Sequence, residues 1–339
     1  VAAHHVLTEI RMDAVNVTLP RGQVVDLEIV NHRRLSVSQT RVDVIKDAGD
    51  DPDVTHGATI FVELTLIPTN EIIFTAAQGV GTVTRDGLAL AIGEPAINPV
   101  PRQMMSEHLN AIAKQCNYTG GFSVAVGVEN GEEIALKTMN GRLGIVGGLS
   151  ILGVSGIVRP FSCSAYIASI FQGMDVATTN GIRHIAASTG NRSEAAIKAH
   201  YQLPDIALIE MGDFVGAVLQ HSKKVPLDKL SFCGGFGKIS KLAMGTWTLH
   251  SKESSIDFPF LAQLATELGA DTALQDAILA ANTSIEALKL CNAQQIDLAT
   301  VICQTPLNEL PRKIPASVEI EVWVINRQGD LIANAQEAN

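Results

Sequence analysis

The stretch RHIAASTGNRSEAAIKAH, residues 183–200, reads as a short apolar strand, a loop of small residues and a helix. The same order follows twice more, after IALIEM (206–211) and after KLSFC (229–233). Three strand–loop–helix units in succession predict a parallel sheet with crossover helices. Ligands of such sheets bind at the carboxyl ends of the strands. The ends in question are residues 188–192, 210–213 and 233–238.

The first part of the chain has a different rhythm. Strand-like runs alternate with turn signals such as Pro20-Arg21-Gly22, which favours antiparallel pairing. The Asn130-Gly131 pair predicts one more hairpin after the strand at 122–128. We therefore predict α/β plus α+β architecture in two domains: a mixed or antiparallel α+β domain and a Rossmann-like parallel-sheet domain with added helices. The predicted ranges are 1–150 for the α+β domain and 151–314 for the Rossmann-like domain, with a helical insertion at 258–300. The segment 315–339 has strand character and is expected to return to the first domain.

The loop KDAGDDPDVTHG, residues 46–57, concentrates acids and a histidine between two apolar strands. A solvated acidic turn is one interpretation. A calcium loop counted from Asp51 is excluded, because its sixth position is His56 and its twelfth is Val62. The remaining alternative is chemistry, with Asp47, Asp50, Asp51 and His56 as candidates for moving a proton.

Two glycine-rich segments leave alternatives open. GGFGKIS (234–240) is GxGxxG with Ser in the last place; a dinucleotide loop and helix–strand packing explain it about equally. Within the segment 141–160, the run Leu143–Val158 carries five glycines and no charged residue. These glycines indicate either a tightly packed crossover or a backbone that approaches a large ligand. No HExxH motif or histidine cluster predicts a metal site.

Composition excludes several classes of function. A net charge of −10 and 4% aromatic residues disfavour nucleic acid as a partner. The uncharged run Leu143–Val158 is too short and too rich in glycine to predict a membrane span. Five cysteines without CxxC spacing indicate reduced thiols and a cytoplasmic protein. The chain opens on an apolar helical run with no capping residue, so we expect its natural start to precede Val1.

The motifs together resemble one family. KDAGDDPDVTHG, GVGTVTRDGL, GEPAINPVPR, NGRLGIVGGLSILGVSGIVRPFS, GDFVG, GGFGKISKLAMG and LHSK occur in this order. The sequence closely resembles the cobalt-precorrin-5B (C-1)-methyltransferase family of anaerobic cobalamin biosynthesis, from about Val24 to about Ala270. Two departures stand out. Relatives often have Thr where Leu249 stands, and often His where Gly235 stands.

The resemblance implies methyl transfer from S-adenosylmethionine to carbon 1 of a cobalt tetrapyrrole, with cobalt present only as part of the substrate. It implies donor-binding residues at the strand ends of the second domain: Gly190, Glu210, Asp213, Gly234, Gly235 and Gly237. Basic residues and a histidine are expected to hold the carboxylates of the macrocycle: Arg102, Arg142, Arg159, Lys238, His250 and Lys252. A homo-oligomer and contacts with other pathway enzymes are compatible with this interpretation. The alternatives are a non-catalytic tetrapyrrole-binding module and a nucleotide-using α/β enzyme.

Overall fold

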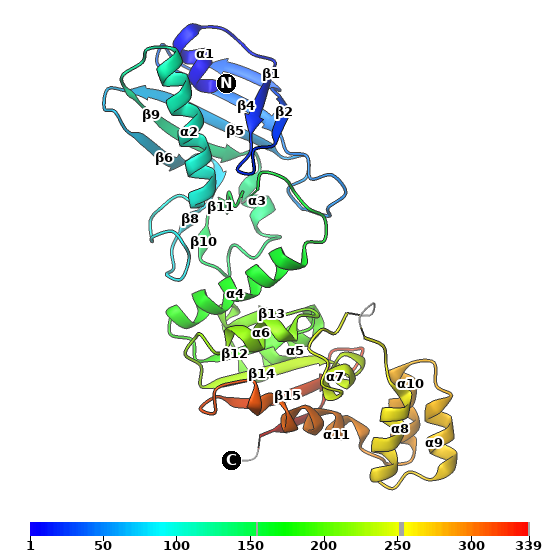
Figure 1. The fold of residues 1–339 in the computed structure, drawn as a ribbon. Helices are drawn as coiled ribbons and strands as arrows, with labels where there is room; N and C mark the ends of the chain where they lie inside the picture. Colours follow the sequence, from blue (N-terminus) through cyan, green and yellow to red (C-terminus); the bar gives the residue numbers. More distant parts are fainter. Residues whose placement is uncertain (154, 251–253, 338–339) are drawn as a thin grey trace. The chain divides into compact units, whose positions relative to one another are not determined.

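The computed structural model describes residues 1–153, 155–250 and 254–337 (Figure 1). The chain divides into two compact units, Val1–Ser162 (unit 1) and Cys163–Asn339 (unit 2). The division therefore falls later than the boundary expected after residue 150. Each unit has its own principal sheet and hydrophobic core, and the fold class is mixed α/β.

Unit 1 is built on a five-stranded sheet with the order β3-β4-β5-β9-β6. Its strands are β3 (Asn31–Arg34), β4 (Gln39–Ile45), β5 (Thr59–Ile67), β6 (Ile72–Ala76) and β9 (Gly121–Val128). Neighbouring strands are antiparallel except β6, which runs parallel to β9. The helices α1 (Ala2–Thr8) and α2 (Pro99–Gln115) bury Val6 and Leu109 in one cluster with Leu64 and Val124 of the sheet. A separate hairpin pairs β1 (Ala14–Thr18) with β2 (Val24–Glu28).

The glycine-rich motifs of unit 1 pack against one another. β7 (Gly79–Val80) runs parallel to β11 (Gly148–Leu149), and β8 (Thr82–Val83) pairs with β10 (Ile145–Val146). Gly79 has a φ of +80°, and a Cβ there would overlap the carbonyl oxygen of Val128. A Cβ on Gly148 would in turn overlap the backbone of Gly79. Close backbone packing therefore explains Gly148, in favour of the first of the two interpretations of segment 141–160.

The hairpin predicted at Asn130-Gly131 is wrong. Asn130 takes the left-handed conformation and helix α3 (Gly131–Ala135) begins directly after it. Gly131 lies so close to Gly79 that a side chain would overlap the carbonyl of Gly79. The glycine thus serves a contact between distant segments and not a local turn.

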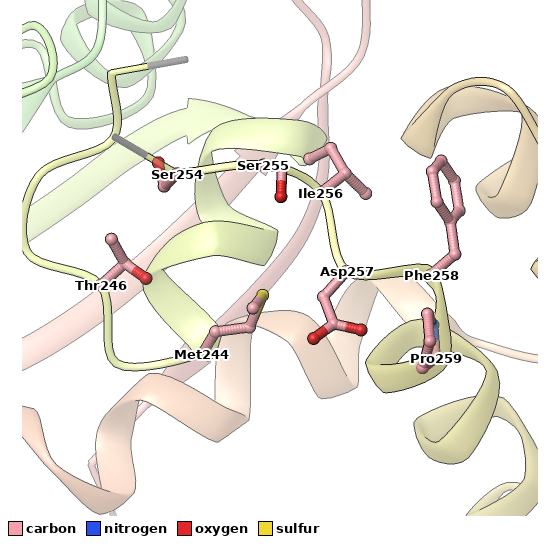
Figure 2. Close-up of a pocket in the computed structure, with 8 residues that line it drawn as sticks. All are labelled: Met244, Thr246, Ser254, Ser255, Ile256, Asp257, Phe258 and Pro259. Carbon is pink, nitrogen blue, oxygen red and sulfur yellow. The ribbon is translucent and has the colours of Figure 1, made fainter. Parts of the chain in front are cut away.

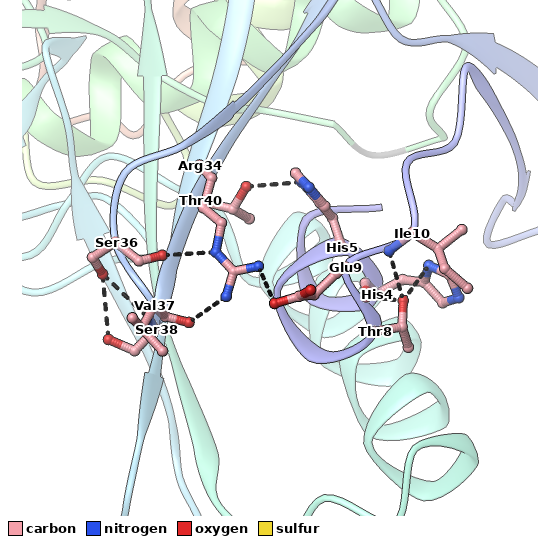
Figure 3. A network of polar contacts seen from close by, with 10 residues as sticks. All are labelled: His4, His5, Thr8, Glu9, Ile10, Arg34, Ser36, Val37, Ser38 and Thr40. Carbon is pink, nitrogen blue, oxygen red and sulfur yellow. Dashed lines mark hydrogen bonds and ion pairs between the residues drawn. The ribbon is translucent and has the colours of Figure 1, made fainter.

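Helix α1 docks on the sheet through a polar network (Figure 3). His5 is 4% exposed, and its Nδ1 lies 3.1 Å from the hydroxyl of Thr40. Arg34 donates to Glu9 at 2.8 Å and to the carbonyls of Ser36 and Val37. These contacts tie the middle and the C-terminal end of the helix to β3, β4 and the turn between them.

Acid should release α1. Burial is the main cause that lowers the pKa of His5 from its ordinary 6.5, and His32, Arg11 and Arg34 lower it further against Glu9. A histidine with a lowered pKa stabilises the fold above its ordinary pKa, and this stabilisation is lost as the pH falls below 6.5. We expect amide exchange in Ala2–Thr8, corrected for intrinsic rates, to accelerate between about pH 7.5 and about pH 5. His5→Gln, whose side chain does not take up a proton in this pH range, should lose the pH dependence of amide exchange in Ala2–Thr8. An unchanged pH dependence in this variant would refute the role of His5.

Unit 2 is built on a five-stranded sheet with the order β13-β12-β14-β15-β16. Its strands are β12 (His184–Ser188), β13 (Leu208–Glu210), β14 (Lys229–Gly235), β15 (Glu319–Ile325) and β16 (Leu331–Gln336). The first four run parallel, as predicted for the three that the sequence identified, and β16 is antiparallel. After β12 the chain adds β13 on one side and β14 on the other. The direction of winding thus reverses between β12 and β14.

The expectation that segment 315–339 returns to the first domain is wrong. β15 pairs with β14 along its whole length, from Glu319 opposite Lys229 to Ile325 opposite Gly235. Its residues after Glu319 are all buried, as in an interior strand with both faces covered. The C-terminal hairpin therefore completes the sheet of unit 2.

Helices cover both faces of this sheet. Alternate residues of β12 point to opposite faces: Ala186 packs with α5 (Asn191–Tyr201), and Ile185 packs in the larger core. That core also takes in α4 (Cys163–Thr179), α6 (Val215–His221) and α7 (Phe236–Ala243). The remaining helices are α8 (Phe258–Glu267), α9 (Thr272–Leu279), α10 (Ser284–Ala293) and α11 (Leu298–Gln304), with 3-10 turns at Asp205–Ala207, Thr305–Asn308 and Leu310–Arg312. The helices α8 to α11 each begin at a side-chain cap, from Asp257, Asp271, Thr283 and Asp297.

Candidate active site

The strand ends at the carboxyl edge of unit 2 are tied to one another. The Thr189 N–H donates to the Cys233 carbonyl at 3.0 Å, which joins the ends of β12 and β14. The N–H groups of Met211 and Gly212 donate to the Ser188 carbonyl at 2.9 and 3.2 Å, which joins the ends of β12 and β13. The three loops predicted to bind a ligand therefore form one continuous edge at the reversal of winding, where open α/β sheets bind ligands.

The four glycines predicted to bind the donor differ in their surroundings. A Cβ on Gly190 or Gly235 would meet nothing within 4 Å, so these two backbones border open space. A Cβ on Gly234 would lie 2.9 Å from Thr189, and one on Gly237 would lie 2.7 Å from the Ser284 hydroxyl of α10. Packing therefore explains Gly234 and Gly237, whereas Gly190 and Gly235 remain accessible to a ligand.

Two further side chains lie at this edge: Ser188, which falls within the predicted strand end 188–192, and Tyr166, which no prediction covered. Ser188 is fully buried, and its hydroxyl has no hydrogen-bond partner among the described residues. The Tyr166 hydroxyl from α4 lies beside Gly212, 2.8 Å from where a Cβ would be. Burial, together with Glu210, Asp213 and Glu194, raises the pKa of Tyr166 to about 12, so its hydroxyl keeps its proton at neutral pH. Tyr166 belongs to a helix without any of the motifs, so no sequence pattern pointed to it.

Two residues predicted for different ligands form an ion pair. Lys238 of α7, predicted to bind the substrate, donates to the carboxylate of Asp213, predicted to bind the donor. The side chains are 37% and 21% exposed, so the pair can be reached from solvent. Glu210 ends β13 two residues before Gly212 and is half-buried. The edge thus presents the carboxylates of Glu210 and Asp213, and Lys238 neutralises that of Asp213.

The acidic loop of unit 1 is braced from within. Lys46 donates to both Asp53 and Thr55, and Asp53 accepts further hydrogen bonds from the N–H and hydroxyl of Thr55 at 2.8 and 2.7 Å. Burial would raise the pKa of Asp53, but the bonds from Lys46 and Thr55 outweigh it and lower that pKa. Asp53 therefore has a structural role.

The four residues predicted to act in catalysis share this loop. Asp47 accepts the Gly49 N–H at 2.8 Å, as in a local turn. His56 accepts the Ala48 N–H at Nδ1, so the proton of its neutral ring lies on Nε2. Asp51 accepts the Phe161 N–H at 3.2 Å and so links the loop to the end of the glycine-rich segment. Asp50 is exposed at the tip.

The basic residues predicted to bind the substrate are placed unequally. Arg102 uses its guanidinium within unit 1, donating to the carbonyls of Ile97 and Pro95 at 2.7 and 3.0 Å and to Glu94 at 3.3 Å. Arg159 is exposed, close in sequence to the Phe161 that Asp51 holds. Arg142 is half-buried, and its carbonyl accepts from Arg85. His250 is exposed on unit 2, and Lys252 lies outside the described residues.

A pocket of about 420 Å³ lies elsewhere in unit 2 (Figure 2). Met244, just after α7, and Thr246 line it opposite the run from Ser254 to Pro259. Its charged side chain, Asp257, caps α8 by accepting the Phe260 N–H at 2.9 Å. The pocket is therefore at the carboxyl end of α7, whereas the strand-end loops meet its amino end.

The described residues contain no group of three or more side chains of His, Cys, Asp or Glu placed to hold a metal ion. Nor does any helix within them have the length and apolar character needed to cross a membrane.

Comparisons with known proteins agree with the motifs. The family model described as CbiD matches residues 1–160, and the model described as CbiD, C-terminal domain, matches residues 248–336. A cobalt-precorrin-5B C(1)-methyltransferase from Marinomonas sp. (strain MWYL1) is 57% identical over 350 aligned residues, covering 100% of this chain and 91% of that protein. One of the same name from Burkholderia multivorans (strain ATCC 17616 / 249) is 59% identical over 99% of this chain and 92% of that protein. Among solved structures, a cobalamin biosynthesis protein (cbiD) from Archaeoglobus fulgidus is 24% identical with a TM-score of 0.38, covering 74% of this chain and 77% of that one. Since both family models match and the identity extends along nearly the whole sequence, the chain belongs to the CbiD family.

Proposed function

We propose that the protein is a cobalt-precorrin-5B C(1)-methyltransferase that uses S-adenosylmethionine as methyl donor. The observation that carries this proposal is the high identity, over nearly the whole chain, to relatives of that name. A methyl transfer from a sulfonium is an in-line displacement in which the donor is already activated. The protein's own contribution is then to bind, orient and exclude water.

The carboxyl edge of unit 2 suits the donor. As in Rossmann-like sheets, the methyl donor binds at the carboxyl ends of β12 and β14, where the direction of winding reverses. The accessible backbone at Gly235, before the amino end of α7, suits the methionine carboxylate. Asp213 or Glu210 accepts from the ribose hydroxyls, and the buried Ser188 hydroxyl supplies a polar group without a partner. The methyl donor would therefore bind through the accessible backbone at Gly235 and the Ser188 hydroxyl together with a carboxylate at this edge.

The macrocycle requires cationic partners for its carboxylates. Of the candidate arginines of unit 1, Arg159 is exposed and Arg142 is half-buried, and a guanidinium suits a carboxylate. His250 is an exposed candidate on unit 2. Arg102 contributes by holding the Glu94–Ile97 segment in shape. The acidic loop repels such a substrate less than its composition indicates, because Lys46 neutralises Asp53. Asp47, Asp50, Asp51 and His56 then position the ring or move a proton.

The direct test is methyl transfer. The full-length protein is incubated with S-adenosylmethionine carrying a labelled methyl group and with cobalt-precorrin-5B, and the label is followed into the tetrapyrrole. Labelled tetrapyrrole supports the proposal. Tetrapyrrole binding without transfer would instead favour a non-catalytic binding module, and binding of ATP but not S-adenosylmethionine would favour a nucleotide-using enzyme.

Asp213→Ala should weaken the binding of S-adenosylmethionine about tenfold or more, because a charge-assisted hydrogen bond to the ribose is lost. Isothermal calorimetry on the full chain measures this change. Asp205→Ala, which removes an exposed acid paired with Lys198 at 2.5 Å, is the matched control and should leave the affinity unchanged. Equal affinity of wild type and Asp213→Ala would remove Asp213 from the donor site.

A further inference from the structure

Lys241 of α7 is a buried lysine whose ammonium group binds two backbone carbonyls. It is 6% exposed, and its Nζ donates to the carbonyls of Leu249 at 3.1 Å and Ser254 at 2.6 Å. Within residues 1–153, 155–250 and 254–337, no carboxylate forms a salt bridge with it. Burial of an ammonium group without a paired carboxylate is costly. The position of this ammonium group therefore requires an explanation.

The carbonyl of Leu249 is the point where two lysines converge. Lys238 and Lys241 lie three positions apart on α7 and therefore share a face of the helix. Lys238 donates to the Leu249 carbonyl at 3.3 Å and also to the Asp213 carboxylate. The Leu249 N–H donates in turn to the Asp213 carbonyl at 2.8 Å. Asp213, Leu249 and Lys238 thus form a closed ring of hydrogen bonds.

The position of Leu249 determines the position of the Asp213 carboxylate. Leu249 is fully buried, and the chain before it is held by the bond from the Gly216 N–H to the Trp247 carbonyl at 2.9 Å. Lys241 fixes Leu249 from the other side and links it to Ser254. Without that contact, the Leu249 carbonyl would be held by the longer bond from Lys238 alone.

We propose that Lys241 is a positioning residue for methyl-donor binding: it fixes Leu249 and, through Leu249 and Lys238, the carboxylate of Asp213. This inference rests on the proposed function, because it assigns Asp213 to the donor. Lys241 itself does not touch the donor. The cost of burying its charge is then offset by the order that it imposes on the donor-binding edge.

The first test compares Lys241→Met with Lys241→Arg in the full-length protein. Lys241→Met removes every hydrogen-bond donor of the side chain and should weaken S-adenosylmethionine binding about tenfold. Lys241→Arg keeps the charge and the hydrogen-bond donors and should stay within about threefold of wild type.

In the protein without S-adenosylmethionine, the Leu249 amide should exchange faster in Lys241→Met, because its hydrogen bond to the Asp213 carbonyl opens more often. The control is Lys229→Met, which removes a lysine that pairs with Glu319 and Glu321 at the other end of β14. It should lower stability and leave donor affinity unchanged.

The second test is a double-mutant cycle on donor affinity. If Lys241 acts through the Asp213 carboxylate, Lys241→Met should add little to the loss already caused by Asp213→Ala. Additive losses would overturn the proposal, and so would wild-type affinity in Lys241→Met. Should Lys241→Met fail to fold, Lys241→Gln, which keeps a shorter donor, takes its place in both tests. A wild-type protein that binds no S-adenosylmethionine would refute the proposed function itself, which separates the two failures.

Discussion

Gly79→Ala adds a single methyl group and should lower the free energy of unfolding of unit 1 by about 3 kcal/mol or more. Two penalties add at this position. The φ of +80° disfavours any residue with a Cβ, and the added methyl group would overlap the carbonyl oxygen of Val128. The atoms that a Cβ on Gly79 would meet belong to the backbone of Val128 and Gly131, so no side chain can move aside to relieve the overlap.

The measurement must distinguish the units. Both tryptophans, Trp247 and Trp323, belong to unit 2, so tryptophan fluorescence follows unit 2 alone. Amide exchange in β5 and β9 reports on unit 1. Gly147→Ala is the matched control, since Gly147 has a φ of +85° but a Cβ there meets nothing within 4 Å. It should cost about 1 kcal/mol. Equal effects of the two substitutions would mean that backbone conformation, and not close packing, explains these glycines.

These glycines illustrate which parts of the fold a sequence can predict. The parallel strands of unit 2 were predicted because each strand, its loop and its helix are neighbours in sequence, so local patterns suffice. Gly79, Gly131 and Gly148 contact one another from segments far apart in the chain. The Asn130-Gly131 pair therefore had the composition of a hairpin, although its glycine serves a remote contact. Local composition cannot distinguish these two uses.

The C-terminal hairpin was misassigned for a related reason. The apolar run of β15 identifies it as a strand, but strand character does not name a pairing partner. In the structure its partner is β14, although the helices α7 to α11 lie between the two strands in the chain. The usable signal in the sequence was the uninterrupted apolar run Val322–Ile325, because strands of parallel sheets are covered on both faces and lack polar alternation.

The candidate site was predicted in outline and not in its contacts. The strand-end loops were identified correctly as neighbours, since the carboxyl ends of parallel strands share an edge. The pairing of Asp213 with Lys238 was not foreseen, because it joins a loop to the first turn of a later helix. Tyr166 was missed because no motif covers its segment, and Lys241 was missed because its motif, GGFGKISKLAMG, was interpreted through its glycines and Lys238. Their roles arise from what the fold places beside them.

Glu321→Gln should lower the free energy of unfolding of unit 2 by about 3 kcal/mol, because it removes the negative charge from a buried charged network. Glu321 of β15 is 2% exposed and accepts from the hydroxyls of Ser231 and Tyr201 and from Lys229, whose Nζ is 2.9 Å away. His184 joins through a 2.7 Å contact with Ser231. The network lies at the amino ends of β12 and β14, away from the strand ends that carry the proposed donor site, so stability should change while donor affinity does not. Glu319→Gln is the control: its side chain is 36% exposed and pairs with the same lysine, so it should cost about 1 kcal/mol or less.

The same network should make unit 2 sensitive to acid. Burial would raise the pKa of Glu321, but hydrogen bonds from Ser231, Tyr201 and Lys229 outweigh it and lower that pKa. Burial, and then Lys229, lower the pKa of His184 from its ordinary 6.5. A lowered pKa has the same consequence for both groups, since the unfolded chain binds protons at a higher pH than the folded one. The stability of unit 2 should therefore decline as the pH falls below 6.5 through His184, and decline further below the ordinary 4.5 of Glu321. Urea unfolding followed by tryptophan fluorescence measures this decline. In Glu321→Gln the decline below pH 4.5 should be shallower, and an identical decline would mean that folding does not lower the pKa of Glu321.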